Sequence, residues 1–244
     1  MNLITLNDLI QSKIYLGHSF QKSNLQKNKY IYKIINNICI IDLIKTAKSL
    51  ILSYVFFYNI GFNNQKILFI NSQEQFTKSI ELTSLITLNY YLNDKFIPGF
   101  FTNWKQIYTN ILLLKWFRYL ITLFNKPIFS WKTKKFFKNI TSFKKLSIKY
   151  NSFYNLTNIP TIIFIVNLTK DHLAFREAIH LNKYIISIID TNNTDVYINL
   201  PIPGNNDNYY SVNLILQLLT TALLHGTNLK TINLEKLNKC KKII

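Results

Sequence analysis

Lysines interleaved with aromatic residues are the side chains of this sequence with the clearest chemical use. Residues 131–138 are Trp-Lys-Thr-Lys-Lys-Phe-Phe-Lys. Ammonium groups neutralise phosphates, and flat aromatic faces stack on unpaired bases, so this run suits a nucleic-acid surface. The alternative is a solvated helix whose aromatic residues pack inward.

The positive charge is concentrated in the middle of the chain. The 244 residues include 29 basic and 11 acidic side chains, for a formal net charge of +18. Residues 95–170 hold 13 of the basic residues, none of the acidic ones and half of the aromatic ones. This distribution favours a polyanionic partner, either nucleic acid or an anionic membrane surface.

The overall composition has a separate origin. The chain contains 38 Ile, 31 Asn and 27 Lys but only 5 Gly, 5 Pro and 2 Arg. The first group has A/T-rich codons and the second mostly G/C-rich ones, so an A+T-rich genome, such as that of an organelle, explains the skew. The preference for Lys over Arg therefore carries little chemical information.

Motifs for catalysis or cofactor binding are absent from the sequence. Phosphate-binding loops need closely spaced glycines, and here the five glycines are far apart. His172 and His180 are eight positions apart, which does not suit two metal ligands on one helix face, and Cys39 and Cys240 lie at opposite ends of the chain. We expect no enzyme activity, no cofactor and no metal site.

Two carboxylates, those of Asp42 and Asp190, directly follow predicted strands. Asp42 and Asp190 could converge in space, although helix capping or a turn is the favoured role for each. Two long uncharged runs, residues 49–65 and 208–224, are 17 residues long and contain several polar side chains, so no membrane-spanning helix is expected. The first 13 residues resemble neither a signal peptide nor a transit peptide.

Short apolar runs alternate with helical patterns along the chain. Strands are predicted at residues 38–41, 66–70, 161–166 and 184–189, and helices at 43–58, 73–89, 172–181 and 209–224. Strands that are apolar throughout are covered on both faces, and alternation with helices implies parallel βαβ units. The pattern predicts a three-layer α/β domain.

The basic segment interrupts this alternation. Helical patterns at residues 104–124 and 133–150, with Pro127 between them, predict a basic α-helical hairpin inserted into the α/β domain. We therefore predict one domain over residues 1–244. Its body covers about 5–103 and 159–226, the hairpin covers 104–158, and a basic C-terminal tail covers 227–244.

Several ordered strings resemble one protein family, that of small-subunit ribosomal protein two. They are Gly17-His18, Lys29-Tyr30-Ile31, Ile40-Ile41-Asp42-Leu43, Gly99 with Thr102-Asn103, Asp171-His172, Arg176-Glu177-Ala178, Asp190-Thr191-Asn192 and Pro201-Ile202-Pro203-Gly204-Asn205-Asn206-Asp207. Order and spacing agree over roughly residues 5–226. Some positions differ: Leu16 stands where the family has Phe, and Asn167-Leu168 replaces its usual Asp-Pro. The hairpin matches in position only.

The resemblance implies a flavodoxin-like parallel sheet of about five strands and a non-catalytic role in the small ribosomal subunit. We expect a structural constituent of an organellar, mitochondrial ribosome that binds small-subunit ribosomal RNA and docks neighbouring ribosomal proteins. A plastid-type organelle would produce the same composition. The alternatives are a flavodoxin-like nucleotide- or flavin-binding enzyme and a peripheral membrane protein held by residues 95–170.

The residues predicted to contact RNA fall into three groups, and sequence-independent phosphate contacts are their expected mode. They are His18, Lys22, Lys27 and Lys29 near the N-terminus, Lys95, Trp104 and Lys105 near the Thr-Asn motif, and Lys132, Lys134, Lys135 and Lys138 in the hairpin. For His18, capping of the first turn is an equal alternative.

Overall fold

A five-stranded parallel sheet forms the centre of the protein in a computed structural model, which describes residues 4–23, 29–124, 147, 150 and 156–241. The strands are β4 (Ile67–Ile70), β5 (Tyr90–Leu92), β6 (Ile162–Ile165), β7 (Tyr184–Ile189) and β8 (Leu200–Pro203). Their spatial order is β5-β4-β6-β7-β8, and every neighbouring pair is parallel. This order is that of flavodoxin-like folds and confirms the predicted α/β class.

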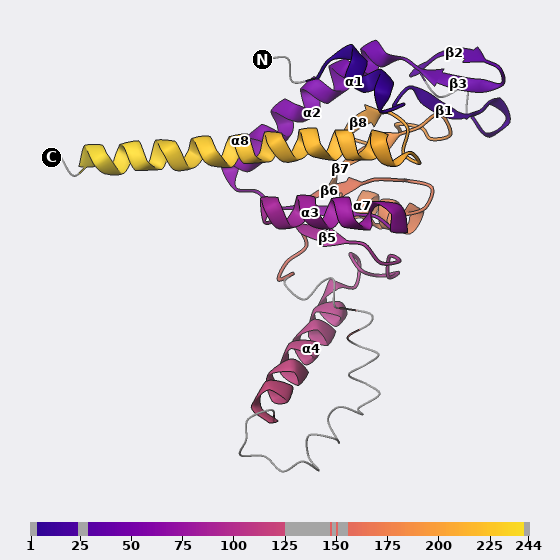
Figure 1. Cartoon of the computed structure of the whole chain (residues 1–244). Helices are drawn as coiled ribbons and strands as arrows, with labels where there is room; N and C mark the ends of the chain where they lie inside the picture. The colour runs from indigo at the N-terminus through magenta and orange to yellow at the C-terminus, as the bar shows by residue number, and fades with distance from the viewer. Residues whose placement is uncertain (1–3, 24–28, 125–146, 148–149, 151–155, 242–244) are drawn as a thin grey trace.

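Helices cover both faces of the sheet, so the domain has three layers (Figure 1). Helices α2 (Leu43–Asn63), α3 (Thr77–Thr87) and α8 (Tyr209–Lys241) pack on one face, and α4 (Trp104–Phe124) and α7 (His172–His180) pack on the other. Successive strand residues point to opposite faces. Accordingly, Phe69 and Phe164 belong to the first core, and Leu68 and Ile163 belong to the second.

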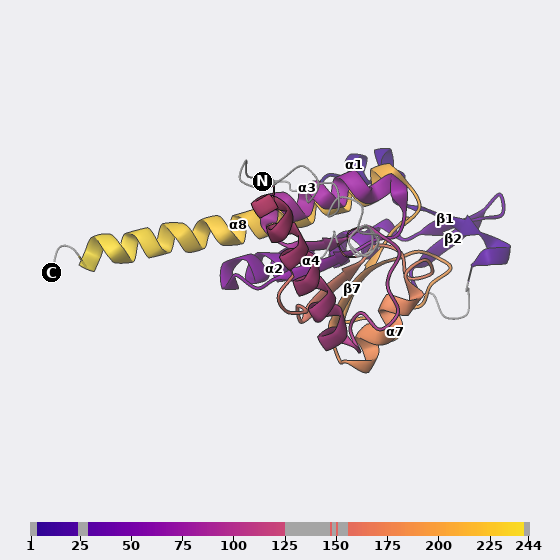
Figure 2. The same ribbon diagram turned by 90° about the horizontal axis from the view of Figure 1, so that it is seen from below.

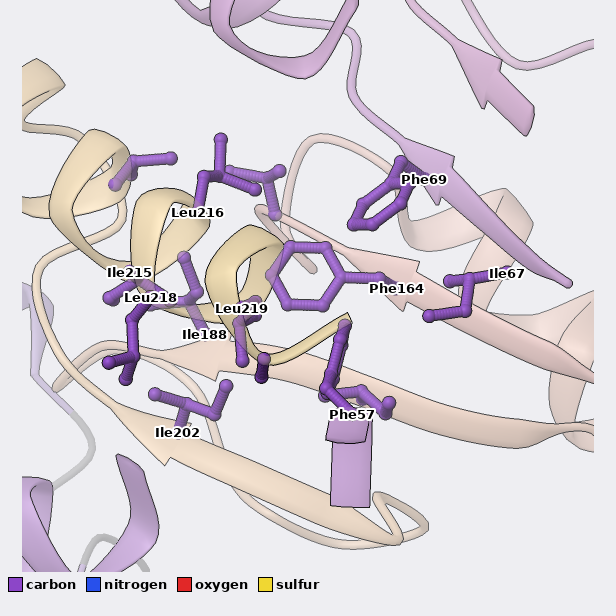
Figure 3. Close-up of a cluster of buried hydrophobic side chains, with 14 of the residues drawn as sticks. Phe57, Ile67, Phe69, Phe164, Ile188, Ile202, Ile215, Leu216, Leu218 and Leu219 are labelled. Carbon is purple, nitrogen blue, oxygen red and sulfur yellow. The ribbon is translucent and has the colours of Figure 1, made fainter. Parts of the chain in front are cut away.

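Three phenylalanine rings pack against one another within the first core, among Ile and Leu side chains (Figure 3). Phe164 of β6 lies between Phe69 of β4 and Phe57 of α2, with ring centroids 5.5 and 6.3 Å apart, and all three side chains are fully buried. Burying each such side chain stabilises the fold by about 1.5–3 kcal/mol. Leu216 and Leu219 of α8 complete the contact with the sheet.

Helices α2 and α8 approach each other through two glycines. A Cβ atom at Gly226 would lie 2.1 Å from the carbonyl oxygen of Tyr58, and one at Gly61 would lie 2.3 Å from the carbonyl oxygen of Leu223. No side chain fits at either position, so backbone packs directly on backbone here. Beyond this crossing, α8 extends away from the body (Figures 1 and 2).

The strand predicted at residues 38–41 exists but belongs to a different sheet from the one expected. As β3 (Ile38–Ile41) it pairs antiparallel with β1 (Leu16–Ser19) and β2 (Ile31–Ile35), in the order β1-β3-β2. Asn36 and Asn37 form a two-residue turn between β2 and β3, with φ angles of 47° and 62°. Positive φ at both central residues is typical of hairpin turns, so the Asn-Asn pair dictates antiparallel pairing.

The two edge strands of the parallel sheet, β5 and β8, were not predicted. Strand β5 has only three residues, and β8 contains Pro201 and Pro203, which are tolerated at a sheet edge because no neighbour needs their missing N–H groups. The other predicted strands and helices of the body are present with small shifts at their ends. Helix α8 continues from Tyr209 to Lys241, across residues 227–241 of the predicted tail.

Helix α4 confirms the first helical pattern of the inserted segment, over the predicted residues 104–124. Its first half joins the second core through Ile107, Ile111 and Leu114, and the helix then extends from the body on the side opposite α1 (Leu6–Gln11) (Figure 1). The second predicted helix, at residues 133–150, lies outside the described residues apart from 147 and 150. Among the helices described, none has the length and apolar character required to cross a membrane.

Candidate nucleic-acid interface

Polar side chains gather at the carboxyl edge of the parallel sheet, where the loops after its strands meet. Asp207, after β8, accepts hydrogen bonds from the side-chain amides of Asn167, after β6, and Gln73, after β4, at 3.1 and 3.3 Å. These contacts link three loops that are distant in sequence. The edge is the place where doubly wound sheets bind ligands, and here it is occupied by the chain's own side chains.

His18 of β1 lies between two carboxylates at this edge. Its Nδ1 atom is 3.3 Å from Oδ1 of Asp190, which follows β7, and its Nε2 atom is 3.1 Å from Oδ2 of Asp207. The Asp190 side chain is 1 % exposed, whereas that of Asp207 is 48 % exposed. The ring therefore ties the antiparallel sheet to the parallel one, a role that differs from both the capping and the RNA contact considered from the sequence.

The pKa of His18 is raised above its ordinary value. Its interaction with the Asp190 carboxylate is the largest cause, and the negative charges of Asp190 and Asp207 add to it. Partial burial of the ring and the positive charge of Lys22 act in the opposite direction. A protonated imidazole fits the site because it can interact with both carboxylates at once.

The Gly17-His18 and Asp190-Thr191-Asn192 motifs pack directly on each other. The backbone N–H of His18 donates a 2.9 Å hydrogen bond to Oγ1 of Thr191, whose own hydroxyl donates to Asp190. A Cβ atom at position 17 would lie 2.4 Å from Cγ2 of Thr191, so only glycine fits. Asp190 thus closes a turn, as favoured from the sequence, and it also holds His18.

Asp42 has a separate structural role. Its side chain accepts hydrogen bonds from the backbone N–H groups of Ile44 and Lys45 at the start of α2, as expected of a helix cap. The convergence of Asp42 with Asp190 that the sequence left open is not needed to explain either residue.

Lys29 forms an ion pair with a carboxylate of the α/β body. Its Nζ atom is 2.6 Å from Oδ2 of Asp195, which also accepts a 3.0 Å hydrogen bond from the Tyr30 hydroxyl. The hydrogen bond to Asp195 raises the pKa of Lys29. Burial alone would raise the pKa of Asp195, but the hydrogen bonds from Lys29 and Tyr30 outweigh it and lower that pKa. Because Lys29 already neutralises a carboxylate, it is a weaker candidate for phosphate binding than the sequence indicated.

Glu177 of α7 organises the loop that leads into α4. Its carboxylate accepts hydrogen bonds from the backbone N–H groups of Gly99, Phe101 and Thr102, at 2.9 Å for Phe101 and 3.3 Å for Thr102. Gly99 has a φ of 82°, a conformation that favours glycine. The loop before α4 therefore takes its shape from a single side chain on the neighbouring helix.

This loop sets the position of two predicted contact residues. The Trp104 ring is half-buried and packs edge-on against Phe100, with centroids 5.6 Å apart, so it anchors the start of α4. Lys105, next to it, is exposed, and so are Lys95 before the loop and Lys22 near β1. The structure thus makes Lys95 and Lys105 neighbours of one ordered loop and gives Trp104 a packing role.

Two exposed aromatic residues on α4 are not among the contact residues predicted from the sequence. Trp116 is 55 % exposed and Tyr119 is 60 % exposed, and they are three positions apart on one side of the helix. Lys115 and Arg118 adjoin them in the chain. The sequence of this helix does combine aromatic and basic residues without acidic ones. The helical period alone, however, does not say which of the aromatic side chains are buried and which are exposed. Lys27, Lys132, Lys134, Lys135 and Lys138 lie outside the described residues.

Three features define the class of protein: a 2-1-3-4-5 parallel sheet, a carboxyl edge filled by the chain's own polar side chains, and a helix projecting from an acid-free segment. In the part of the chain that is described, no group of three or more His, Cys, Asp or Glu residues could hold a metal ion. The strand order is that of a flavodoxin-like α/β protein.

Comparison with known proteins gives the family. The family model described as "Ribosomal protein S2" matches residues 9–226, so the chain belongs to the ribosomal protein S2 family. Its members are structural proteins of the ribosome, and the chain is not an enzyme.

The sequences of individual relatives match this chain over most of their length. Small ribosomal subunit protein uS2 of Wolbachia pipientis is 31 % identical over 91 % of this chain and 79 % of its own. The uS2 protein of Ehrlichia canis is 29 % identical over 91 % and 75 %. The protein named uS2c of Cyanophora paradoxa is 28 % identical over 96 % of this chain and the whole of its own.

Proposed function

We propose that this protein is a constituent of an organellar, mitochondrial small ribosomal subunit, in which it binds small-subunit ribosomal RNA and docks neighbouring proteins. The coarser statement, that it is a small-subunit ribosomal protein with a structural role in translation, follows from its family and relatives. RNA contact, partners and compartment are the proposed part.

The observation that carries the RNA proposal is the uneven distribution of charge: all acidic side chains lie outside residues 95–170, which hold 13 basic ones. In the body, Asp190 and Asp207 interact with His18, Asp195 pairs with Lys29, and Glu177 is saturated by backbone N–H groups. Residues 95–170 contain no carboxylate at all. The positive charge of this segment therefore has no acidic partner within it, which suits an external polyanion.

The proposed mechanism is phosphate neutralisation with aromatic packing. Lys105 lies on the exposed side of the α4 start, and Trp116 and Tyr119 offer exposed rings further along the helix. Lysine–phosphate contacts position a protein without reading the base sequence, and they weaken as salt rises because condensed counterions are released on binding. The ordered loop at Glu177 fixes the direction in which these groups point.

The composition supports an organellar origin. High Ile, Asn and Lys with low Gly, Pro and Arg is the outcome of an A+T-rich coding sequence. Sequencing the genomic locus tests this part directly: a mitochondrial gene is expected, a plastid gene would move the same function to the other organelle, and a nuclear or bacterial gene would contradict it.

Sedimentation of organelle lysate tests the RNA-binding role. The protein should co-sediment with small-subunit ribosomal RNA and should leave that fraction after ribonuclease treatment but not after detergent. Release by detergent alone would support the peripheral membrane alternative. A protein that never co-sediments with the RNA would contradict the proposal.

The hairpin lysines have their own test. Reversing the charge of Lys132, Lys134, Lys135 and Lys138 to Glu should prevent incorporation into the subunit, because four favourable phosphate contacts would become repulsive. The control is Lys183→Glu on the body, far in sequence from the hairpin. Normal incorporation of the fourfold variant would show that these lysines are solvated and make no contact.

A further inference from the structure

A groove beside α1 differs in character from the proposed RNA surface. One hollow of about 610 Å³ lies between α1 and α8, and a second of about 460 Å³ lies between α1 and α2. The two share Ile4, Tyr54 and Leu218 as lining residues, so they form one continuous depression. We call it the α1 groove. In Figure 1, α1 lies at the end of the molecule opposite α4.

The half of the groove between α1 and α2 is apolar and open to solvent. Leu6, Ile51 and Val55 line it and are 61 %, 65 % and 53 % exposed. Neighbouring exposed apolar side chains of this size mark surfaces that another molecule covers. Because α2 carries Ile51 and Val55 at a spacing of four, they form one continuous ridge along the helix.

The other half is lined by polar side chains, two of which are already hydrogen-bonded: Thr221 donates to the Leu218 carbonyl, and His225 pairs with the Tyr54 hydroxyl. Asn213, Gln217, Thr221 and His225 follow one another at intervals of four along α8 and line the groove together with Gln11 of α1. Within the described residues, the side-chain amides of Gln11, Asn213 and Gln217 make no hydrogen bond. Along α8, the row of side chains from Asn213 to His225 is roughly 18 Å long, about the length of three helical turns.

The charge of the groove points to the chemistry of its occupant. Among the described residues, no Lys or Arg lines either hollow, and Asp8 supplies the single carboxylate. Oδ2 of Asp8 accepts hydrogen bonds from the backbone N–H and hydroxyl of Thr5, which lower the pKa of Asp8 and keep it ionised. The lining therefore offers a phosphate no lysine or arginine, whereas the Asp8 carboxylate can pair with a cationic side chain.

We propose that the α1 groove docks an amphipathic helix of a neighbouring small-subunit protein. The helix would place apolar side chains at i, i+3 or i+4 spacing against Leu6, Ile51 and Val55, and a Lys or Arg beside Asp8. Its polar flank would meet the free amides of α8. This inference rests on the proposed function, because it requires assembly into the subunit, but it assigns the groove to protein and not to RNA.

Site-specific photo-crosslinking in assembled small subunits identifies the occupant. The full chain carries benzoylphenylalanine at Val55 in one sample and at Gln217 in another, and crosslinked products are sequenced by mass spectrometry. Both positions should crosslink to one protein segment with apolar residues at helical spacing and a Lys or Arg. Crosslinks to RNA, crosslinks to a segment without these features, or no crosslink at all would overturn the proposal.

A charge variant gives a second, quantitative test. Ile51→Glu should lower the amount of the crosslinked neighbour in purified subunits at least tenfold, because a carboxylate would be buried against its apolar side chains. Ile51 is exposed in the free chain, so the fold should tolerate the change. Leu82→Glu, at a 59 % exposed position of α3 away from the groove, is the matched control.

Unchanged occupancy in the Ile51→Glu subunits would overturn the groove assignment. The wild-type sedimentation experiment separates this result from a failure of the proposed function: a chain that co-sediments with ribosomal RNA while Ile51→Glu has no effect keeps its RNA-binding role and loses only the groove.

Discussion

His18 and Asp207 are joined across the molecule: Nε2 of His18, on the antiparallel sheet, lies 3.1 Å from Oδ2 of Asp207, which follows the last strand of the parallel sheet. Asp190 contacts the other ring nitrogen. A single imidazole thus connects two sheets that share no backbone hydrogen-bond ladder. Its protonation state should therefore influence how firmly the antiparallel sheet is held.

The stabilisation contributed by His18 should depend on pH. Because the pKa of His18 is raised in the folded state, this contribution is fully present below the unfolded-state pKa of about 6.5 and is lost as pH rises through the folded-state pKa. Urea unfolding of wild type and His18→Gln should differ more at about pH 6 than at about pH 9. His180→Gln, at an exposed position of α7, is the control, and an equal pH profile for both variants would contradict the prediction.

Replacing Glu177 should loosen the loop before α4. Glu177→Gln leaves one acceptor oxygen and turns an amide donor toward backbone N–H groups, so we expect a loss of about 2 kcal/mol in the free energy of unfolding. Urea unfolding measures it, with exposed Glu74→Gln as the control. Hydrogen exchange at Phe101 and Thr102 should rise in Glu177→Gln, and unchanged exchange would show that the carboxylate does not organise the loop.

Substitution of Gly226 tests the backbone contact between α2 and α8. In an isolated helix, Gly→Ala is favourable by about 1 kcal/mol, whereas here a Cβ would clash with Tyr58 and separate the helices. Gly226→Ala should therefore destabilise the protein by about 2–3 kcal/mol. Asn228→Ala, at an exposed position of α8, should be neutral or slightly stabilising. Stabilisation by Gly226→Ala would show that the two helices are not in close contact.

The exposed aromatics of α4 should affect RNA binding and not folding. Trp116 is 55 % exposed, so Trp116→Ala should change the free energy of unfolding by less than about 1 kcal/mol. If its ring stacks on a base, affinity for small-subunit RNA should fall by about 1–3 kcal/mol in a filter-binding assay. Tyr32→Ala, at a 73 % exposed position of β2, is the control; equal losses from both variants would argue against a specific role for α4.

Lys105→Gln should weaken RNA binding through charge alone. Binding is described by the slope of log affinity against log salt concentration. Removing one phosphate contact should make this slope less steep by about one, because one fewer counterion is released. The measurement is affinity for small-subunit RNA at several salt concentrations. Lys29→Gln is the comparison, since Lys29 already pairs with Asp195 and its loss should leave the salt dependence nearly unchanged.

Local patterns in the sequence were sufficient for much of the body. Strand β7 is present at the predicted residues 184–189, and α7 begins at the predicted His172, because runs of buried Ile and a 3.6-residue period are properties of neighbouring residues. The family resemblance, carried by strings such as Pro203-Gly204-Asn205, was likewise readable and is confirmed by the match over residues 9–226. The position of the acid-free segment, residues 95–170, can also be read directly from the sequence.

Only the tertiary structure decided which strands pair with one another and which distant side chains come into contact. Strand β3 has the apolar residues of a central parallel strand, yet the turn at Asn36-Asn37 folds it against β2, and exposed Ile38 shows that one face is left uncovered. Edge strand β8 escaped prediction because its prolines oppose strand structure everywhere except at an edge. Capping and turn propensities assigned Asp190 a local role, but its contact with His18 depends on long-range packing that no local pattern contains.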